Sequence, residues 1–254
     1  MVDPMSQFVV KTVLPLKVGD LDLSITNSTL AMAGAAGLLC LFFGLAFSRA
    51  AIVPSRLQTV GELLYELIDD LGESIMGHAG KAFFPLVFSL FAFIMTMNFM
   101  GMFLIFTPTS QLAVTATLAM ITMGIVVIVG FVKNGLGFFK LFVPSGVPIF
   151  LLPLMIPIEV ISFLVRPLTL ALRLFGNMLG GHVVLNIFGS FVVSLGLLGL
   201  AGGLATLGFF GSALALSSVV ALLALEFIVA FLQAFVFAAL TCVYLNDVVN
   251  LHHH

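Results

Sequence analysis

Residues 208–246 read GFFGSALALSSVVALLALEFIVAFLQAFVFAALTCVYLN, a run of about 40 residues in which Glu226 is the only charged side chain. As an α-helix with a rise of ~1.5 Å per residue, this run would reach about 60 Å, whereas the hydrocarbon core of a bilayer is ~30 Å thick. Soluble domains do not normally contain uncharged stretches of this length. The run therefore predicts a membrane helix that is strongly tilted or kinked.

The composition of the whole chain indicates the same environment. Of its 254 residues, 61% are hydrophobic and 8% are charged, so no segment is polar enough to fold separately in water. The formal net charge of -2, with no run of lysine or arginine, does not support a nucleic-acid partner. We predict an all-α membrane protein in which residues 1–254 form a single membrane domain.

Four further apolar regions are long enough to enter a membrane, which makes about five membrane-embedded helices. Three have the length of ordinary spans: residues 29–48, 82–106 and 112–132. The other, residues 148–198, exceeds one span and contains Pro153, Pro157 and Pro167, which predict kinks because proline removes a helical hydrogen bond. The last two helices are thus expected to be long and strongly tilted or kinked.

Residues 54–81 have the pattern of an amphipathic helix, with apolar and acidic residues on opposite faces. The apolar positions are Leu57, Val60, Leu64, Leu67, Leu71 and Ile75, and the acidic positions are Glu62, Glu66, Asp69, Asp70 and Glu73. Thr59 and Glu62 fit a capping box, and Ser55 is the alternative cap. We expect a surface helix whose acidic face is either a docking surface for a partner or a solvated linker.

The basic residues of the short loops predict how the chain is oriented. One side carries Arg49, Arg56, Lys81, Lys133 and Lys140, and the other side carries Lys11 and Lys17. Cytoplasmic loops of membrane proteins are enriched in lysine and arginine. The N-terminal segment, residues 1–28, is therefore predicted to be external and the C-terminus cytoplasmic.

Few acidic or basic side chains interrupt the last two apolar regions. They are Glu159, Arg166, Arg173, His182 and Glu226, joined by the amides Asn177 and Gln233. An ionised side chain inside a membrane costs ~2.5–3.5 kcal/mol on insertion scales, so each one needs a partner, a water-filled path or access to the interface. At about 100° per residue, Glu159, Arg166, Arg173 and Asn177 share one helix face, which predicts a polar stripe.

His182 is expected on the opposite face of the same helix, about 180° from Arg173. Glu226 and Gln233 share a face of the following helix, so this face is a candidate to meet His182. An imidazole and a carboxylate in an otherwise uncharged bundle are typical of a proton relay. The alternative for His182 is an interior histidine with only a structural role.

The two arginines differ in how easily their charge can be explained. Arg166 is interpreted as structural, either paired with Glu159 or reaching the interface, and a functional role for Glu159 stays open. Arg173 is followed by about 50 residues without another lysine, arginine, aspartate or glutamate, so no interface is near and we predict a functional cation. Asn177 either joins helices or orders water.

Small residues lie beside Arg173, and other motifs are missing from the sequence. Gly176 and Gly180 form a GxxxG step with Gly181 next to it, which lets another helix approach closely. The sequence has neither a phosphate-binding loop nor a Cys/His cluster with metal-ligand spacing. We therefore predict no catalytic residues, no cofactor, no metal and no nucleotide bound by this chain.

The run LALRLFGNMLGGH, residues 170–182, resembles the signature of F-type ATP synthase subunit a, above all in LRLFGNM at residues 172–178. The stretches PIEVISFLVRPLTLALRLFGN, residues 157–177, and LEFIVAFLQAFVFAALTCVYLND, residues 225–247, also have that family's spacing of polar groups. The resemblance covers residues 148–247 and implies paired long, tilted helices beside a rotor.

The resemblance also implies a role for each polar residue. Arg173 corresponds to the stator arginine, which attracts the ionised carboxylate of a passing c-ring helix and blocks proton leakage between two offset half-channels. Glu159 corresponds to the inner half-channel. The residues that correspond to the outer half-channel are Asn177, His182, Glu226 and Gln233. Many bacterial members have an acid at the position of His182 and a histidine at that of Glu226, so this pair is of the mitochondrial and alphaproteobacterial type.

The implied protein is a non-catalytic, proton-translocating subunit of the Fo sector in a bacterial inner membrane, where it couples proton flow to rotation and ATP synthesis. The implied partners are the c-ring, b-type subunits of the peripheral stalk and the remaining F1Fo subunits. A secondary transporter is the main alternative, but it predicts internal repeats that this sequence lacks. A membrane protein with a purely structural role is disfavoured by Arg173 and the His182/Glu226 pair, and a Na⁺-driven version of the same machine stays open.

Overall fold

The computed structural model describes residues 10–15, 17–18, 21–22, 24–48, 51, 53–103, 107–143, 149–200 and 206–250. Most of these residues are helical. The long helices are α1 (Asn27–Phe47), α2 (Arg56–Met76), α3 (Gly80–Phe103), α4 (Leu112–Asn134), α5 (Leu152–Gly199) and α6 (Leu207–Val249). Short 3-10 helices connect or precede them: η2 (Gly77–Ala79), η3 (Pro108–Ser110), η4 (Gly135–Phe142) and η5 (Ile149–Leu151).

The strands of the N-terminal segment are two or three residues long. Strand β1 (Thr12–Leu14) pairs with β4 (Ile25–Thr26), and β2 (Lys17–Val18) pairs with β3 (Leu21–Asp22), both in antiparallel fashion. The chain then enters α1, where the Thr26 hydroxyl caps the helix by accepting a hydrogen bond from the Thr29 N–H.

Five helical segments of the described chain are long and apolar enough to cross a membrane. They are Asn27–Phe47, Arg56–Phe103, Leu112–Phe142, Leu152–Gly199 and Leu207–Val249. This result confirms the prediction of an all-α membrane protein. The helix bounds differ by a few residues from those predicted, because α3 begins at Gly80 and α6 continues to Val249. Residues 104–106, which the prediction placed in the second span, lie outside the described part of the chain, as does Arg49.

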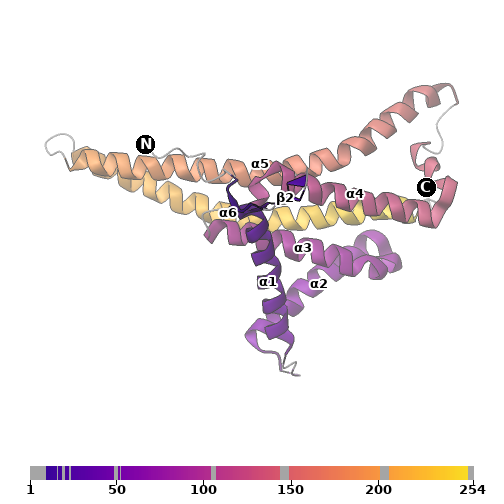
Figure 1. Cartoon of the computed structure of the whole chain (residues 1–254), viewed down its shortest axis with the longest axis horizontal. Coiled ribbons are helices and arrows are strands. Elements are labelled where there is room, and N and C mark those ends of the chain that lie inside the picture. Colours follow the sequence, from indigo (N-terminus) through magenta and orange to yellow (C-terminus); the bar gives the residue numbers. More distant parts are fainter. Residues whose placement is uncertain are drawn as a thin grey trace.

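The two longest helices, α5 and α6, run side by side over much of their length (Figure 1). Helix α5 bends in its first half, which contains Pro157 and Pro167, and α6 continues without a break. The backbones meet closely near the end of α5, since a Cβ atom on Gly208 would lie 2.5 Å from the Leu195 carbonyl oxygen. Helix α1 crosses this pair at a steep angle (Figure 1). Helix α1 has the length of one ordinary span, which is the length needed to cross the membrane directly. When α1 crosses in this way, helices that meet it at a steep angle are strongly tilted, as predicted for α5 and α6.

Helix α2 packs against α1, α3 and α6. Ser55 is its N-cap, because the Ser55 hydroxyl accepts from the Gln58 N–H at 3.3 Å. The capping box predicted for Thr59 is therefore wrong: its hydroxyl donates to the Ser55 carbonyl oxygen instead. The helix ends at Gly77, whose φ of 58° favours glycine and stops the helix.

Not all of the apolar face predicted for α2 is buried. Ile68 and Met76 belong to the core, and the predicted positions Leu64, Leu67, Leu71 and Ile75 pack partly against it. Leu57 and Val60 are exposed, whereas Gln58 between them is buried. Of the five acidic side chains predicted for the opposite face, Glu66, Asp70 and Glu73 are exposed, whereas Glu62 and Asp69 are half-buried.

The main hydrophobic core joins α3, α4, α5 and α6. Its largest fully buried side chains include Phe91, Ile94 and Met97 of α3, Val126 of α4, Leu170 and Leu174 of α5, and Phe237 and Leu245 of α6. The connection η3 contacts α3, α4 and α5 and buries the hydroxyl groups of Thr109 and Ser110. Glu226 and Gln233, two of the polar residues that interrupt α6, are also buried.

Candidate functional site

Arg173 lies on an exposed face of α5. Its guanidinium forms no hydrogen bond or ion pair with any residue that the structure describes. Beside it, Cβ atoms built on Gly176 and Gly180 would meet nothing within 4 Å. The face around Arg173 is therefore open at these two glycines, and the close approach of another helix there stays a prediction.

Gly181 was grouped with Gly176 and Gly180 in the sequence, but it lies on the side of α5 that faces Glu226, whereas the other two glycines face open space. A Cβ atom at Gly181 would lie 2.7 Å from Oε1 of Glu226 on α6. The glycine therefore provides space for the Glu226 carboxyl group within the α5–α6 interface. The reason is helical geometry, since one residue step turns the side-chain direction by about 100° away from that of Gly180.

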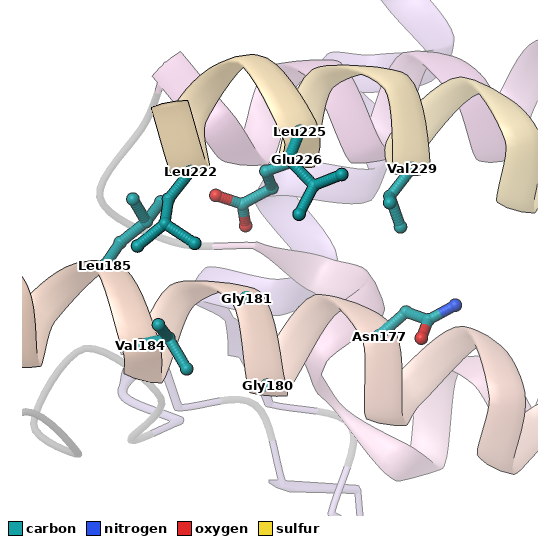
Figure 2. A pocket seen from close by; sticks show the side chains of 9 residues that line it. All are labelled: Asn177, Gly180, Gly181, Val184, Leu185, Leu222, Leu225, Glu226 and Val229. Carbon is teal, nitrogen blue, oxygen red and sulfur yellow. The ribbon is translucent and has the colours of Figure 1, made fainter. Parts of the chain in front are cut away.

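Glu226 is a buried acid with an exposed fraction of 5%. Its side chain extends from α6 towards α5, into a pocket of about 250 Å³ that Asn177, Gly180, Gly181 and Leu222 help to line (Figure 2). Neither of its carboxyl oxygens has a hydrogen-bond partner among the described residues. A buried acid without such a partner is costly in a purely structural role.

His182 faces Glu226 from α5. Its Nε2 atom lies 3.6 Å from Oε1 of Glu226 and 2.9 Å from the Thr107 hydroxyl. The imidazole and the carboxyl group are thus neighbours, as their positions on the two helices predict. Thr107 precedes η3, so the pair is completed by a residue from outside both long helices.

Asn177 and Gln233 form a second polar contact between α5 and α6. The Asn177 amide nitrogen donates to Oε1 of Gln233 at 2.7 Å, and Gln233 is 5% exposed. Gln233 is two helical turns after Glu226, so both lie on the face of α6 that meets α5. This bond agrees with the interpretation that Asn177 joins the helices.

Arg166 is held by several neighbours, in contrast to Arg173. It donates to Asp247 at 2.7 Å, lies 4.0 Å from Glu159, and stacks over the Tyr244 ring at 4.9 Å. Pairing with Glu159 was the expected contact, but Asp247 of α6 is the closer partner. Glu159 and Arg166 are seven residues apart on α5, so the sequence places them on the same helix face. The contact between Arg166 and Asp247 depends instead on how α6 packs against α5.

Three contacts of the site were not predicted from the sequence. Thr107 and Asp247 approach His182 and Arg166 only after folding, and neither residue type is unusual near the end of an apolar segment. Asn98 is fully buried in α3 and donates to the Ala230 carbonyl oxygen of α6 at 3.0 Å. The presence of Asn98, an amide inside the predicted span 82–106, was the sequence signal for a polar contact at this position.

The polar groups are arranged in order along α5. The Glu159–Arg166–Asp247 cluster lies towards the start of the helix, Arg173 follows, and the His182–Glu226 pair lies further on. At ~1.5 Å per residue, His182 is about 14 Å beyond Arg173, and Glu159 is about 21 Å before it. Charged or titratable groups thus lie on both sides of Arg173, which forms no hydrogen bond or ion pair with a described residue.

The fold and the site define a class: a helical membrane protein in which two long helices enclose an acid–imidazole pair and an amide pair, next to an outward-facing arginine. Within that class, the chain belongs to the ATP synthase A chain family, whose family model matches residues 29–246. It is 50% identical over 249 residues to "ATP synthase subunit a" of Rhizobium johnstonii, which covers 98% of this chain and 97% of that protein.

Two further relatives bear the same name. The protein of Sinorhizobium fredii is 49% identical over 256 residues and covers 99% of both chains. That of Mesorhizobium japonicum is 48% identical over 253 residues, covering 99% of this chain and 98% of the relative. The resemblance found in residues 148–247 therefore extends over nearly the whole chain.

Proposed function

We propose that this chain is the proton-translocating stator subunit of the Fo sector of an ATP synthase in a bacterial inner membrane. In this role Arg173 meets the carboxylate of a passing c-ring helix. The observation that carries the proposal is the state of Arg173, which faces an open, small-residue surface without a hydrogen bond or ion pair to any described residue. A guanidinium in a membrane needs a counter-charge, and the open face supports one from another chain.

Arg166 provides the contrast within the same helix. Its charge is already compensated by Asp247 and Glu159, so it has little capacity to attract a further carboxylate. Arg173 retains that capacity. Since arginine stays protonated even when it is partly desolvated, it suits this role better than lysine.

The chemistry follows from the cost of charge in lipid. A rotor carboxyl group must be neutral while it faces lipid, and ionisation becomes favourable when it approaches Arg173. A proton is therefore released on one side of the arginine and taken up on the other. Alternation of these two steps, driven by a proton gradient, turns the rotor in one direction.

The polar groups on either side of Arg173 support two offset half-channels. His182, Glu226, Asn177 and Gln233 are the outer group in this proposal, and the pocket at Glu226 leaves room for water beside a buried carboxyl group. Glu159 contributes to the inner path. Arg173 separates the two paths, because a fixed positive charge repels a proton that would pass directly between them.

The orientation proposed for the chain has the N-terminus outside and the C-terminus in the cytoplasm. Lys133, at the end of α4, lies 5.9 Å from the ring of Phe83 near the start of α3. Lys81 lies in the first turn of α3, close to Phe83 in the sequence. These two basic residues are therefore found at the same end of the helix bundle. This grouping supports a cytoplasmic location for that end.

The test measures ATP-driven proton pumping and passive proton conduction in vesicles that carry the complete complex. We expect Arg173→Ala to reduce pumping at least 10-fold while the complex still assembles, because the rotor carboxylate loses its counter-charge. Arg173→Lys should also pump poorly, since lysine gives up its proton more readily when desolvated. Undiminished pumping by Arg173→Ala would remove this residue from the mechanism.

Arg56→Ala is the matched control, because Arg56 is an exposed arginine at the start of α2 and belongs to neither α5 nor α6. It should pump at the normal rate. Equal losses in both variants would indicate a general effect of removing a positive charge rather than a role for Arg173.

A further inference from the structure

We propose that Thr107 is a positioning residue that determines the proton-bearing nitrogen of His182 and holds its ring beside Glu226. The observation is a buried chain of polar contacts from the Gly101 carbonyl oxygen through the Thr107 hydroxyl to His182. Thr107 lies outside α5 and α6 and is 4% exposed. The proposal deepens the proposed function, since it concerns how the outer proton path is organised.

The direction of the hydrogen bonds follows from the donors available. The Thr107 hydroxyl donates to the Gly101 carbonyl oxygen at 3.2 Å, and a carbonyl oxygen can only accept. When the hydroxyl gives its one proton to Gly101, its 2.9 Å contact with Nε2 of His182 is a hydrogen bond only with Nε2 as the donor. In this proposal the neutral imidazole therefore carries its proton on Nε2.

The same contact determines the position of the imidazole ring relative to Glu226. Nε2 is within hydrogen-bond distance of Thr107 but lies 3.6 Å from Oε1 of Glu226. Thr107 thus keeps the ring next to the carboxyl group without a direct hydrogen bond between the two. In this geometry, a proton moves between His182 and Glu226 only after the ring turns or a water molecule enters.

Thr107 is itself held firmly by its surroundings. Its carbonyl oxygen accepts from the Ser110 hydroxyl at 2.6 Å and from the Ser110 N–H at 3.1 Å. Its side chain fills the space above Gly101, where an added Cβ atom would lie 2.6 Å from the Thr107 hydroxyl oxygen. Gly101 therefore leaves the space in which Thr107 can reach His182.

The experiment reads the tautomer of His182 directly, by the ¹⁵N resonances of its ring in the assembled complex with histidine-labelled subunit. The His182 signals are assigned by their loss in His182→Gln. We expect Nε2 to be protonated in the unaltered protein, and Thr107→Val to move at least half of the neutral population to the Nδ1-protonated form. Thr107→Ser keeps the hydroxyl and should restore the original signals.

Thr122→Val is the matched control, because Thr122 is fully buried and its hydroxyl bonds only within α4, to the Leu118 carbonyl oxygen. It should leave the His182 signals unchanged. Gly101→Ala, which displaces Thr107, should reproduce the effect of Thr107→Val. An unchanged tautomer in Thr107→Val, or an equal change in Thr122→Val, would overturn the proposal. This readout does not depend on proton pumping, so it can fail while the proposed function stands.

Discussion

At the scale of single residues, the charged side chains of α5 fall into two kinds. Arg166 and Glu159 reach compensating charges within the chain, whereas Arg173 reaches none among the described residues. The buried carboxyl group of Glu226 is similar to Arg173 in lacking a hydrogen-bond partner in the described chain. In the proposed function, Arg166 and Glu159 are held by charges within the chain, and Arg173 and Glu226 are the groups that take part in proton transport.

The Arg166–Asp247 pair is predicted to contribute to stability rather than to transport. Arg166→Ala leaves the half-buried Asp247 carboxylate without its closest partner, which is costly in a low-dielectric environment. We expect the amount of assembled complex in membranes to fall about threefold, as measured by quantitative immunoblotting after purification of the complex. The remaining complex should pump protons at nearly the normal rate per molecule.

The double variant Arg166→Ala/Asp247→Asn is the control for this prediction, because it removes both charges together. It should recover part of the lost complex, since no unpaired carboxylate remains. A double variant that assembles no better than Arg166→Ala would show that stacking of Arg166 on Tyr244, rather than the ion pair, stabilises this region.

At the scale of elements, the helix contacts depend on a few glycines that permit close approach. A Cβ atom on Gly80, the first residue of α3, would lie 2.6 Å from the Gly72 carbonyl oxygen of α2. This contact brings α2 back along α3 after the short turn of η2. The amphipathic helix is thereby packed against the neighbouring helices.

Gly80→Ala is predicted to destabilise this junction by about 1–3 kcal/mol, because the added methyl group meets backbone atoms that have little freedom to move. The measurement is the thermal unfolding of the purified complex, with limited proteolysis at α2 as a local probe. Gly124→Ala in α4 is the control, since its Cβ atom would meet nothing within 4 Å. Equal stability of the two variants would contradict the importance of the close approach.

At the scale of the whole molecule, the long α5–α6 pair is the frame around which the other helices are arranged (Figure 1). Helices α3 and α4 pack along α6 and α5, and α1 crosses them steeply. Lys81 and Lys133 lie at helix ends that meet in space. Once the side of the membrane is known for the end that carries Lys81 and Lys133, the side of every segment that joins two helices is known as well.

The orientation can be tested with cysteines introduced at exposed positions and a thiol reagent that does not cross membranes. We expect Leu136→Cys, in η4 and 85% exposed, to react only from the cytoplasmic side, and Val13→Cys, in β1, only from the outside. The background for both is Cys40→Ala, because Cys40 is exposed and Cys242 is buried. Labelling with the sides reversed would contradict the proposed orientation.

Much of this architecture could be predicted from the sequence because membrane helices are specified locally. Apolar length, helical periodicity and the positions of the prolines predict the helices, and seven-residue spacing places Glu226 and Gln233 on one face. The motif around Arg173 pointed to the family that the comparison over residues 29–246 confirms. These features depend on residues that are neighbours in the sequence, so no knowledge of packing is needed.

Other features were decided only by tertiary structure, because they join residues that are distant along the chain. Asp247 rather than Glu159 is the nearest partner of Arg166, and Thr107 contacts His182 across many intervening residues. The sequence alone determined which helices form and where their polar residues lie. Packing decided which of those residues are compensated within the chain, because the distance between two charges depends on how whole helices approach each other.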